Sequence, residues 1–165
     1  MKRITTQNWL EPDATGPAAG MEARAWRDTF LSIRLDRKVP GEVAAQFETA
    51  RASMMYGLFF APLVALGVEQ CYWVLEAGLR ARCAQLDLPV SVQDRQGRDH
   101  ALSFHHNLRQ LLEKGLVSEE DALLWKQAGE LKAWLALPRH GEVVARDHAL
   151  TALTRAATLL NALFA

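Results

Sequence analysis

The chain has 165 residues, of which 50% are hydrophobic and 23% charged, a composition typical of one globular domain rather than of a disordered chain. Nineteen basic side chains balance nineteen acidic ones, so the net charge is zero. RNA binding is therefore unsupported by the total charge, since nucleic-acid-binding proteins usually carry an excess of lysine and arginine. The densest group of basic residues is Arg24, Arg27, Arg34, Arg37 and Lys38.

Neither a signal peptide nor a membrane span is predicted. No apolar segment follows the first basic residues. The uncharged run 54–68 is shorter than the about 20 residues that a membrane helix needs, and Pro62 interrupts it. Cys71 and Cys83 lie in one predicted helix about 18 Å apart, too far for a disulfide. They are predicted to be reduced thiols of a cytoplasmic protein.

The chain begins with a predicted arm and a short helix. Residues 1–20 contain prolines and glycines but few apolar side chains, which predicts an irregular N-terminal arm. Trp9 and Leu10 are its predicted anchor on the domain, which spans residues 21–165. The spacing of apolar residues predicts a first helix from Met21 to Leu35.

Two long helices are predicted next. Pro40 stands where a helix tolerates proline, in the first turn. From Glu42 onward, apolar residues recur every three or four positions, at Val43, Phe47, Ala50, Met54 and Leu58. Pro62 separates this helix from a second one, predicted from about Leu63 to Leu86. A turn-rich connector, residues 88–97, follows it.

Three more helices complete the predicted fold. The first covers residues 101–113, the second begins after the N-cap Ser118 and ends at Pro138, and Asp147 is the predicted N-cap of the last. The predicted buried positions of the last two helices are Leu124, Ala128, Leu131 and Leu135, then Leu150, Leu153, Ala157, Leu160 and Phe164. Since no segment shows the two-residue period of a strand, the fold is predicted to be all-α, an antiparallel bundle of five to six helices.

Two segments together resemble a known family. One is the apolar-to-amphipathic stretch 52–80, and the other begins with Glu130-Leu131-Lys132-Ala133-Trp134-Leu135-Ala136-Leu137-Pro138-Arg139-His140 and continues through the helix 149–164. They resemble the small all-helical HEPN-type domains of bacterial toxin and defence systems, many of which cut RNA. The resemblance covers about residues 40–164. In that family an Arg-polar-x3/5-His element ends one helix just before the last, and dimerisation commonly brings two such elements together.

The catalytic element of that family is degenerate here. Lys132 stands at the arginine, Ala133 at the polar residue and Leu137 at the histidine. Lys132 keeps the positive charge but loses the bidentate geometry of a guanidinium, and Leu137 cannot transfer a proton. The resemblance therefore implies a catalytically silent HEPN-like protein without a cofactor. It would act through protein binding or dimerisation, in a bacterial defence or toxin–antitoxin-like system.

An alternative is a divergent metal-independent ribonuclease that uses Arg139 and His140. A histidine pKa near neutrality suits proton transfer, and a permanently charged guanidinium suits a crowded phosphate. No metal site is predicted, because His105 and His106 have no carboxylate or thiol at the spacing of metal ligands.

The long middle helix also carries candidate binding residues. Glu69, Trp73, Glu76 and Arg80 fall within a narrow arc of this helix. They form either a solvated face, with a Glu76–Arg80 ion pair that contributes only about 0.3–0.5 kcal/mol, or a polar groove for a partner. The resemblance and the aromatic content of this helix predict a homodimer or a protein partner at this surface and the last helix.

Overall fold

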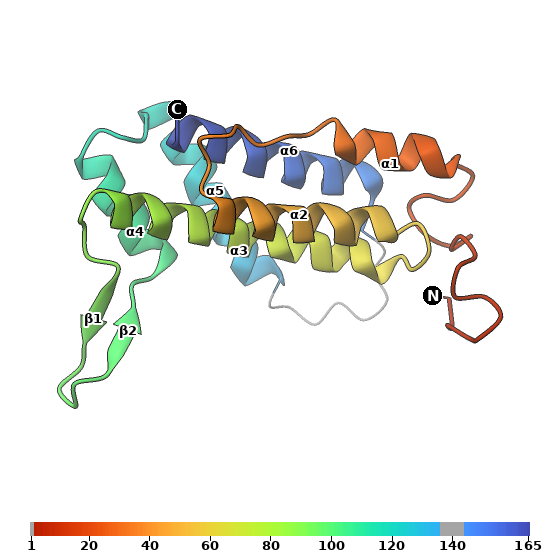
Figure 1. Ribbon diagram of the computed structural model, residues 1–165, viewed down its shortest axis with the longest axis horizontal. Helices are drawn as coiled ribbons and strands as arrows, with labels where there is room; N and C mark the ends of the chain where they lie inside the picture. Colours follow the sequence, from red (N-terminus) through yellow and green to blue (C-terminus); the bar gives the residue numbers. More distant parts are fainter. Residues whose placement is uncertain (1, 136–143) are drawn as a thin grey trace.

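Six helices and one small sheet make up the described part of the chain. The computed structural model describes residues 2–135 and 144–165, and the side chains of residues 2–129 and 144–165. Figure 1 labels the elements, which are α1 Ala23–Leu31, α2 Gly41–Tyr56, α3 Pro62–Gln85, β1 Ser91–Gln93, β2 Asp99–Ala101, α4 Phe104–Glu113, α5 Glu119–Leu135 and α6 Arg146–Leu163. The predicted all-α bundle is confirmed, with a hairpin added to it.

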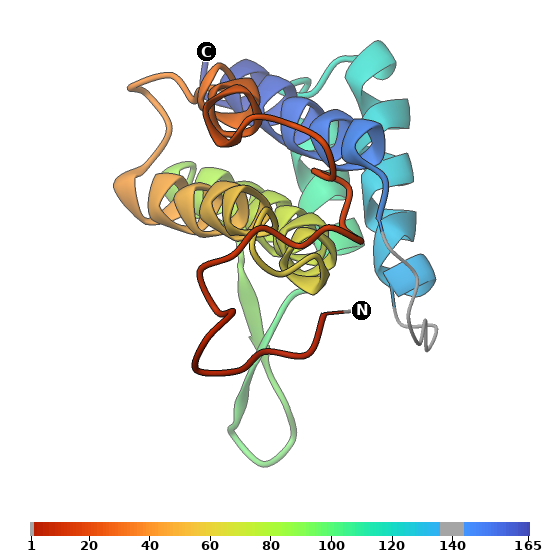
Figure 2. The ribbon, with the colours of Figure 1, turned by 90° about the vertical axis from the view of Figure 1, so that its right-hand side faces the viewer.

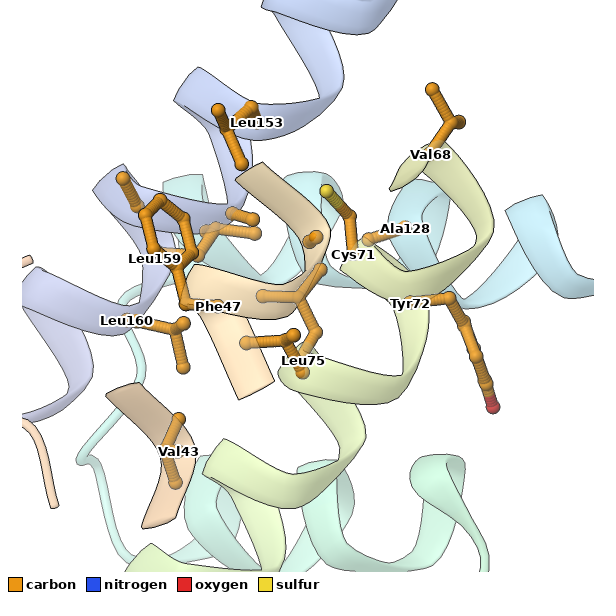
Figure 3. Close-up of a cluster of buried hydrophobic side chains, with 14 of the residues drawn as sticks. Val43, Phe47, Val68, Cys71, Tyr72, Leu75, Ala128, Leu153, Leu159 and Leu160 are labelled. Carbon is orange, nitrogen blue, oxygen red and sulfur yellow. The ribbon is translucent and has the colours of Figure 1, made fainter. Parts of the chain in front are cut away.

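The central helix of the bundle is α3. It contacts α2, α4, α5 and α6, and Figure 2 shows α2 and α3 side by side with α5 at a steep angle to them. Its buried side chains recur at helical spacing and include Val64, Val68, Cys71, Leu75 and Leu79. They join Phe47 of α2 and Leu153, Leu159 and Leu160 of α6 in one core, part of which is drawn in Figure 3.

The two long helices follow the sequence prediction closely. The side chains of Val43, Phe47, Ala50 and Met54 are all 0% exposed, which confirms the predicted buried face of α2. Pro62 is the first residue of α3, where its missing N–H leaves no helical hydrogen bond unmade. The chain therefore turns back between the two helices at the predicted place.

Asp13 fixes the N-terminal arm, and the predicted anchor is wrong. Trp9 and Leu10 are 58% and 59% exposed. The buried carboxylate of Asp13 instead accepts hydrogen bonds from the backbone N–H and the hydroxyl of Thr15 and from the backbone N–H of Ala61. Burial acts to raise the pKa of Asp13, but these hydrogen bonds outweigh it and lower the pKa. A polar contact therefore attaches the arm to the α2–α3 turn.

The turn-rich connector contains a β-hairpin that was not predicted. Strands β1 and β2 pair antiparallel, with Val92 opposite His100, and the hairpin projects from the bundle in Figure 1. Every strand residue is exposed, so the strands lack the alternation of buried and exposed positions by which a sequence reveals them. Helix α4 accordingly begins at Phe104, after the N-cap Ser103, and not at Ala101 as predicted.

A single carboxylate organises the tip of this hairpin. Asp94 accepts hydrogen bonds from the backbone N–H groups of Gln96 and Arg98, and its Oδ2 lies 2.9 Å from Nε2 of His100. The hydrogen bond with His100, followed by that from the Arg98 backbone, lowers the pKa of Asp94 to about 2. The turn is therefore held by local polar contacts rather than by a core.

The starts of α5 and α6 differ in how well they were predicted. Ser118 precedes α5 as expected, because its Oγ accepts a hydrogen bond from the backbone N–H of Asp121. The predicted N-cap Asp147 is wrong: Ala145 is the N-cap of α6, and Asp147 lies in its first turn, where a negative charge favours the helix dipole. The expected stripe of α6 is buried at Leu153, Ala157, Leu160 and Phe164, with Leu150 partly buried.

Candidate interaction surface on α3

One face of the central helix is exposed although its other faces are packed. We name it the α3 stripe and define it by residues spaced at three, four or seven positions: Leu66, Glu69, Trp73, Glu76 and Arg80. Leu66 is 55% exposed and Trp73 is 42% exposed, and Glu69 is exposed as well. Sequence analysis singled out four of the five and missed Leu66. Its position two turns before Trp73 is the signal that identifies it.

The C-terminal end of the α3 stripe is a half-buried polar edge. Nη2 of Arg80 lies 3.5 Å from Oε1 of Glu76, whose side chain is only 12% exposed. Burial, the Glu76 charge and a hydrogen bond to Glu76 together raise the pKa of Tyr72 to about 12. The Tyr72 hydroxyl therefore remains protonated at neutral pH. Glu76 is thus fixed from two sides, while Glu69 and Trp73 face solvent.

Aromatic contacts hold α3 against its neighbours beneath the stripe. The Tyr72 ring stacks on Phe104 of α4 with centroids 5.5 Å apart and meets Trp73 edge-on at 5.2 Å. Phe104 in turn contacts Trp125 of α5, with centroids 6.1 Å apart. Aromatic pairs at these distances are favourable beyond the area they bury. Trp73 therefore projects from a well-packed part of the helix.

No protein-family model, curated protein or solved structure matches this chain. Within residues 2–135 and 144–165, no helix combines the length and the apolar character needed to cross a membrane. What the chain does must therefore be inferred from its own surfaces.

The predicted motif positions fall at the edge of the described chain. Lys132 and Ala133 belong to the last turns of α5, whose bounds are described but whose side chains there are not. Leu137, Arg139 and His140 lie outside the described residues. The degenerate motif and its alternative therefore stay predictions.

His106 has a local partner, and the two cysteines are buried. His106 Nδ1 lies 3.4 Å from Nη2 of Arg109, on the same turn of α4. Among the described residues, no three His, Cys, Asp or Glu side chains are grouped so that they can hold a metal ion. Cys71 and Cys83 are free and buried, and burial raises the pKa of both thiols, that of Cys71 to about 12. Both thiols are therefore protonated and poor nucleophiles at neutral pH.

Proposed function

We propose that this chain is a catalytically silent HEPN-like protein that acts through binding and forms a homodimer through the α3 stripe. The observation that carries the proposal is the exposure of Leu66 and Trp73, two turns apart on the helix that otherwise forms the centre of the core. Large apolar side chains left exposed at regular spacing are typical of interaction surfaces, and tryptophan is enriched among residues that dominate binding.

The distribution of charge on the stripe favours a second copy as the partner. Glu69 lies one turn before Trp73, and Arg80 lies two turns after it, roughly 16 Å along the helix from Glu69. Two α3 helices that meet antiparallel across a two-fold axis near Trp73 bring Glu69 of each protomer to the partner's Arg80. Two-fold dimers are the commonest oligomers, and they require a surface that is complementary to itself.

The biological setting is proposed on sequence grounds. The HEPN resemblance supports a role in a bacterial defence or toxin–antitoxin-like system. The two free thiols support a cytoplasmic location, because disulfides are rare in that compartment. A small domain of this kind would take its specific role from the proteins that it binds.

The substitution Leu66→Glu is expected to dissociate the dimer. It places a charge on the apolar part of the stripe, about one turn beyond the Glu69–Arg80 pair, and the loss of an apolar contact of about 2 kcal/mol corresponds to an affinity about 30-fold weaker. Light scattering at tens of micromolar should give twice the 18.4 kDa chain mass for the unmodified protein and a lower mass for the variant.

Leu123→Glu is the matched control for this substitution. Leu123 is 60% exposed on α5 and does not belong to the α3 stripe, so this variant is expected to remain dimeric. An unmodified protein that is monomeric under these conditions would refute the dimer. Equal effects of the two variants would show that the α3 stripe is not the interface.

No cleavage is expected when the purified protein is incubated with mixed RNA. The reason is chemical, because a leucine at position 137 supplies no group for proton transfer where the family has histidine. The double variant Arg139→Ala/His140→Ala is assayed beside it on denaturing gels. Cleavage by the unmodified protein that disappears in the double variant would instead establish the ribonuclease.

A further inference from the structure

A hollow of about 390 Å³ lies between α5 and α6. Figure 2 shows α5 at a steep angle to α6, so the two helices diverge on either side of their crossing. The volume falls in the range of about 300–1,000 Å³ that is usual for small-molecule sites. The lining consists of one residue of α5 and six of α6, namely Leu124, Leu150, Thr151, Thr154, Arg155, Thr158 and Leu159.

Most of the surface of this hollow is apolar. Leu124 and Leu150 are only partly buried, although their spacing in the sequence predicts core positions, and they border the hollow together with the buried Leu159. Apolar side chains that border an open hollow leave hydrocarbon surface in contact with water, which is unfavourable. A ligand with an apolar chain would cover this surface, and each CH₂ group so buried tightens binding about fourfold.

Arg155 is the one charged residue among the described residues that line the hollow. Within the part of the chain whose side chains are described, its guanidinium makes no hydrogen bond, ion pair or ring contact. The side chain is partly buried, and withdrawing a charge from water without a counter-charge is unfavourable. A carboxylate would supply that counter-charge, and its two oxygens match the paired donors of a guanidinium.

Threonine hydroxyls beside Arg155 supply further hydrogen-bond donors. The hydroxyl of Thr151 already donates to the carbonyl of Asp147 at 2.7 Å. The hydroxyls of Thr154 and Thr158 make no hydrogen bond within the described residues. Thr158 follows Arg155 by three positions, and residues three apart on a helix are neighbours. Arg155 and Thr158 can therefore donate to the same anionic group.

We propose that this hollow binds a free medium-chain carboxylate. Its carboxylate lies on Arg155 and Thr158, and its alkyl chain extends toward Leu150 along the apolar lining. Thr151 and Thr158 are two turns apart, about 10.5 Å along α6, which suits an extended chain of about eight carbons. A single cation matches the single negative charge of such a ligand. The hollow shares no residue with the α3 stripe, so the proposal is independent of the proposed dimer.

Isothermal titration calorimetry of the full-length protein with octanoate tests this site. One octanoate is expected to bind saturably per chain. Octanol and octylamine have the same alkyl chain without the negative charge, and each is expected to bind at least 10-fold more weakly because the charged hydrogen bonds are lost. Hexanoate is shorter by two CH₂ groups and is expected to bind about 10-fold more weakly than octanoate.

Three variants place the ligand in this hollow. Arg155→Gln removes the charge and is expected to raise the dissociation constant of octanoate at least 10-fold. Thr154→Trp changes an exposed residue of the lining, keeps Arg155, and is expected to block binding by filling the hollow. Arg24→Gln is the matched control, because Arg24 is an exposed arginine of α1 that does not line the hollow, and its affinity should be unchanged. Thermal unfolding of all three variants shows that they are folded.

Four results would overturn the proposal. The first is the absence of saturable octanoate binding, and the second is binding of octanol or octylamine as tight as that of octanoate. The third is an unchanged affinity in Arg155→Gln or in Thr154→Trp. The fourth is sedimentation of the protein with phosphatidylglycerol vesicles that free octanoate does not reverse, because the hollow would then belong to a lipid surface.

Discussion

The substitution Gly67→Ala is expected to lower the free energy of unfolding by about 1–3 kcal/mol, the usual cost of overpacking a core. A Cβ atom at this position would lie 2.5 Å from Cγ of Met54 and 2.8 Å from the carbonyl oxygen of Ala50. Met54 is 0% exposed and has little room to move, and the Ala50 carbonyl belongs to the α2 backbone. Helices α2 and α3 must therefore separate. Thermal unfolding followed by circular dichroism should show a Tm lower by about 4–8 °C for a loss of about 2 kcal/mol.

The control for this substitution is Gly41→Ala. Gly41 is the first residue of α2, and a Cβ atom there meets no other atom within 4 Å. Alanine restricts the unfolded chain more than glycine does, which stabilises a compatible site by about 0.4–1 kcal/mol. Gly67→Ala should therefore lower the Tm, whereas Gly41→Ala should raise the Tm slightly or leave it unchanged. An unchanged Tm for Gly67→Ala would show that α2 and α3 do not approach closely at this glycine.

The helices could be predicted because burial on one face leaves a periodic trace in the sequence. Phe47 and Met54 of α2 and Leu153 and Leu160 of α6 were all predicted from that period, and all are buried. Pro62 was correctly placed at the break between α2 and α3, since its ring is compatible with a helix only in the first turn. The all-α class follows from these regularities.

The features that were not predicted depend on contacts between distant parts of the sequence, or on exposure. Neither produces a local periodic pattern of apolar residues. The arm is attached through Asp13 to Ala61, 48 residues away, whereas hydropathy pointed to Trp9. Asn161 fixes the α1–α2 loop through Asp36, 125 residues away, so the position of that loop could not be predicted from local sequence. Leu66 was missed in the uncharged run 54–68, and it is exposed because the neighbours of α3 pack against the other faces of the helix.

The substitution Trp125→Ala is expected to lower the free energy of unfolding by about 3–5 kcal/mol. Trp125 is 1% exposed, and its ring contacts Phe104, which stacks on Tyr72. The substitution therefore leaves a cavity where α3, α4 and α5 meet. Because the free energy of unfolding of a domain is typically about 5–15 kcal/mol, the substitution removes a large share of the stability of the protein. Urea denaturation should show a lower midpoint with an unchanged slope.

The control for Trp125→Ala is Trp9→Ala, which removes a tryptophan side chain from a site that is 58% exposed. Exposed substitutions usually change stability by no more than about 0.5 kcal/mol, so its unfolding midpoint should stay close to that of the unmodified protein. The two variants differ in burial and not in the atoms removed, and their difference therefore measures what packing contributes at Trp125. If Trp125→Ala loses no more stability than Trp9→Ala, the contact of Trp125 with Phe104 does not hold α5 against α3. The aromatic packing would then not support Trp73 in the α3 stripe.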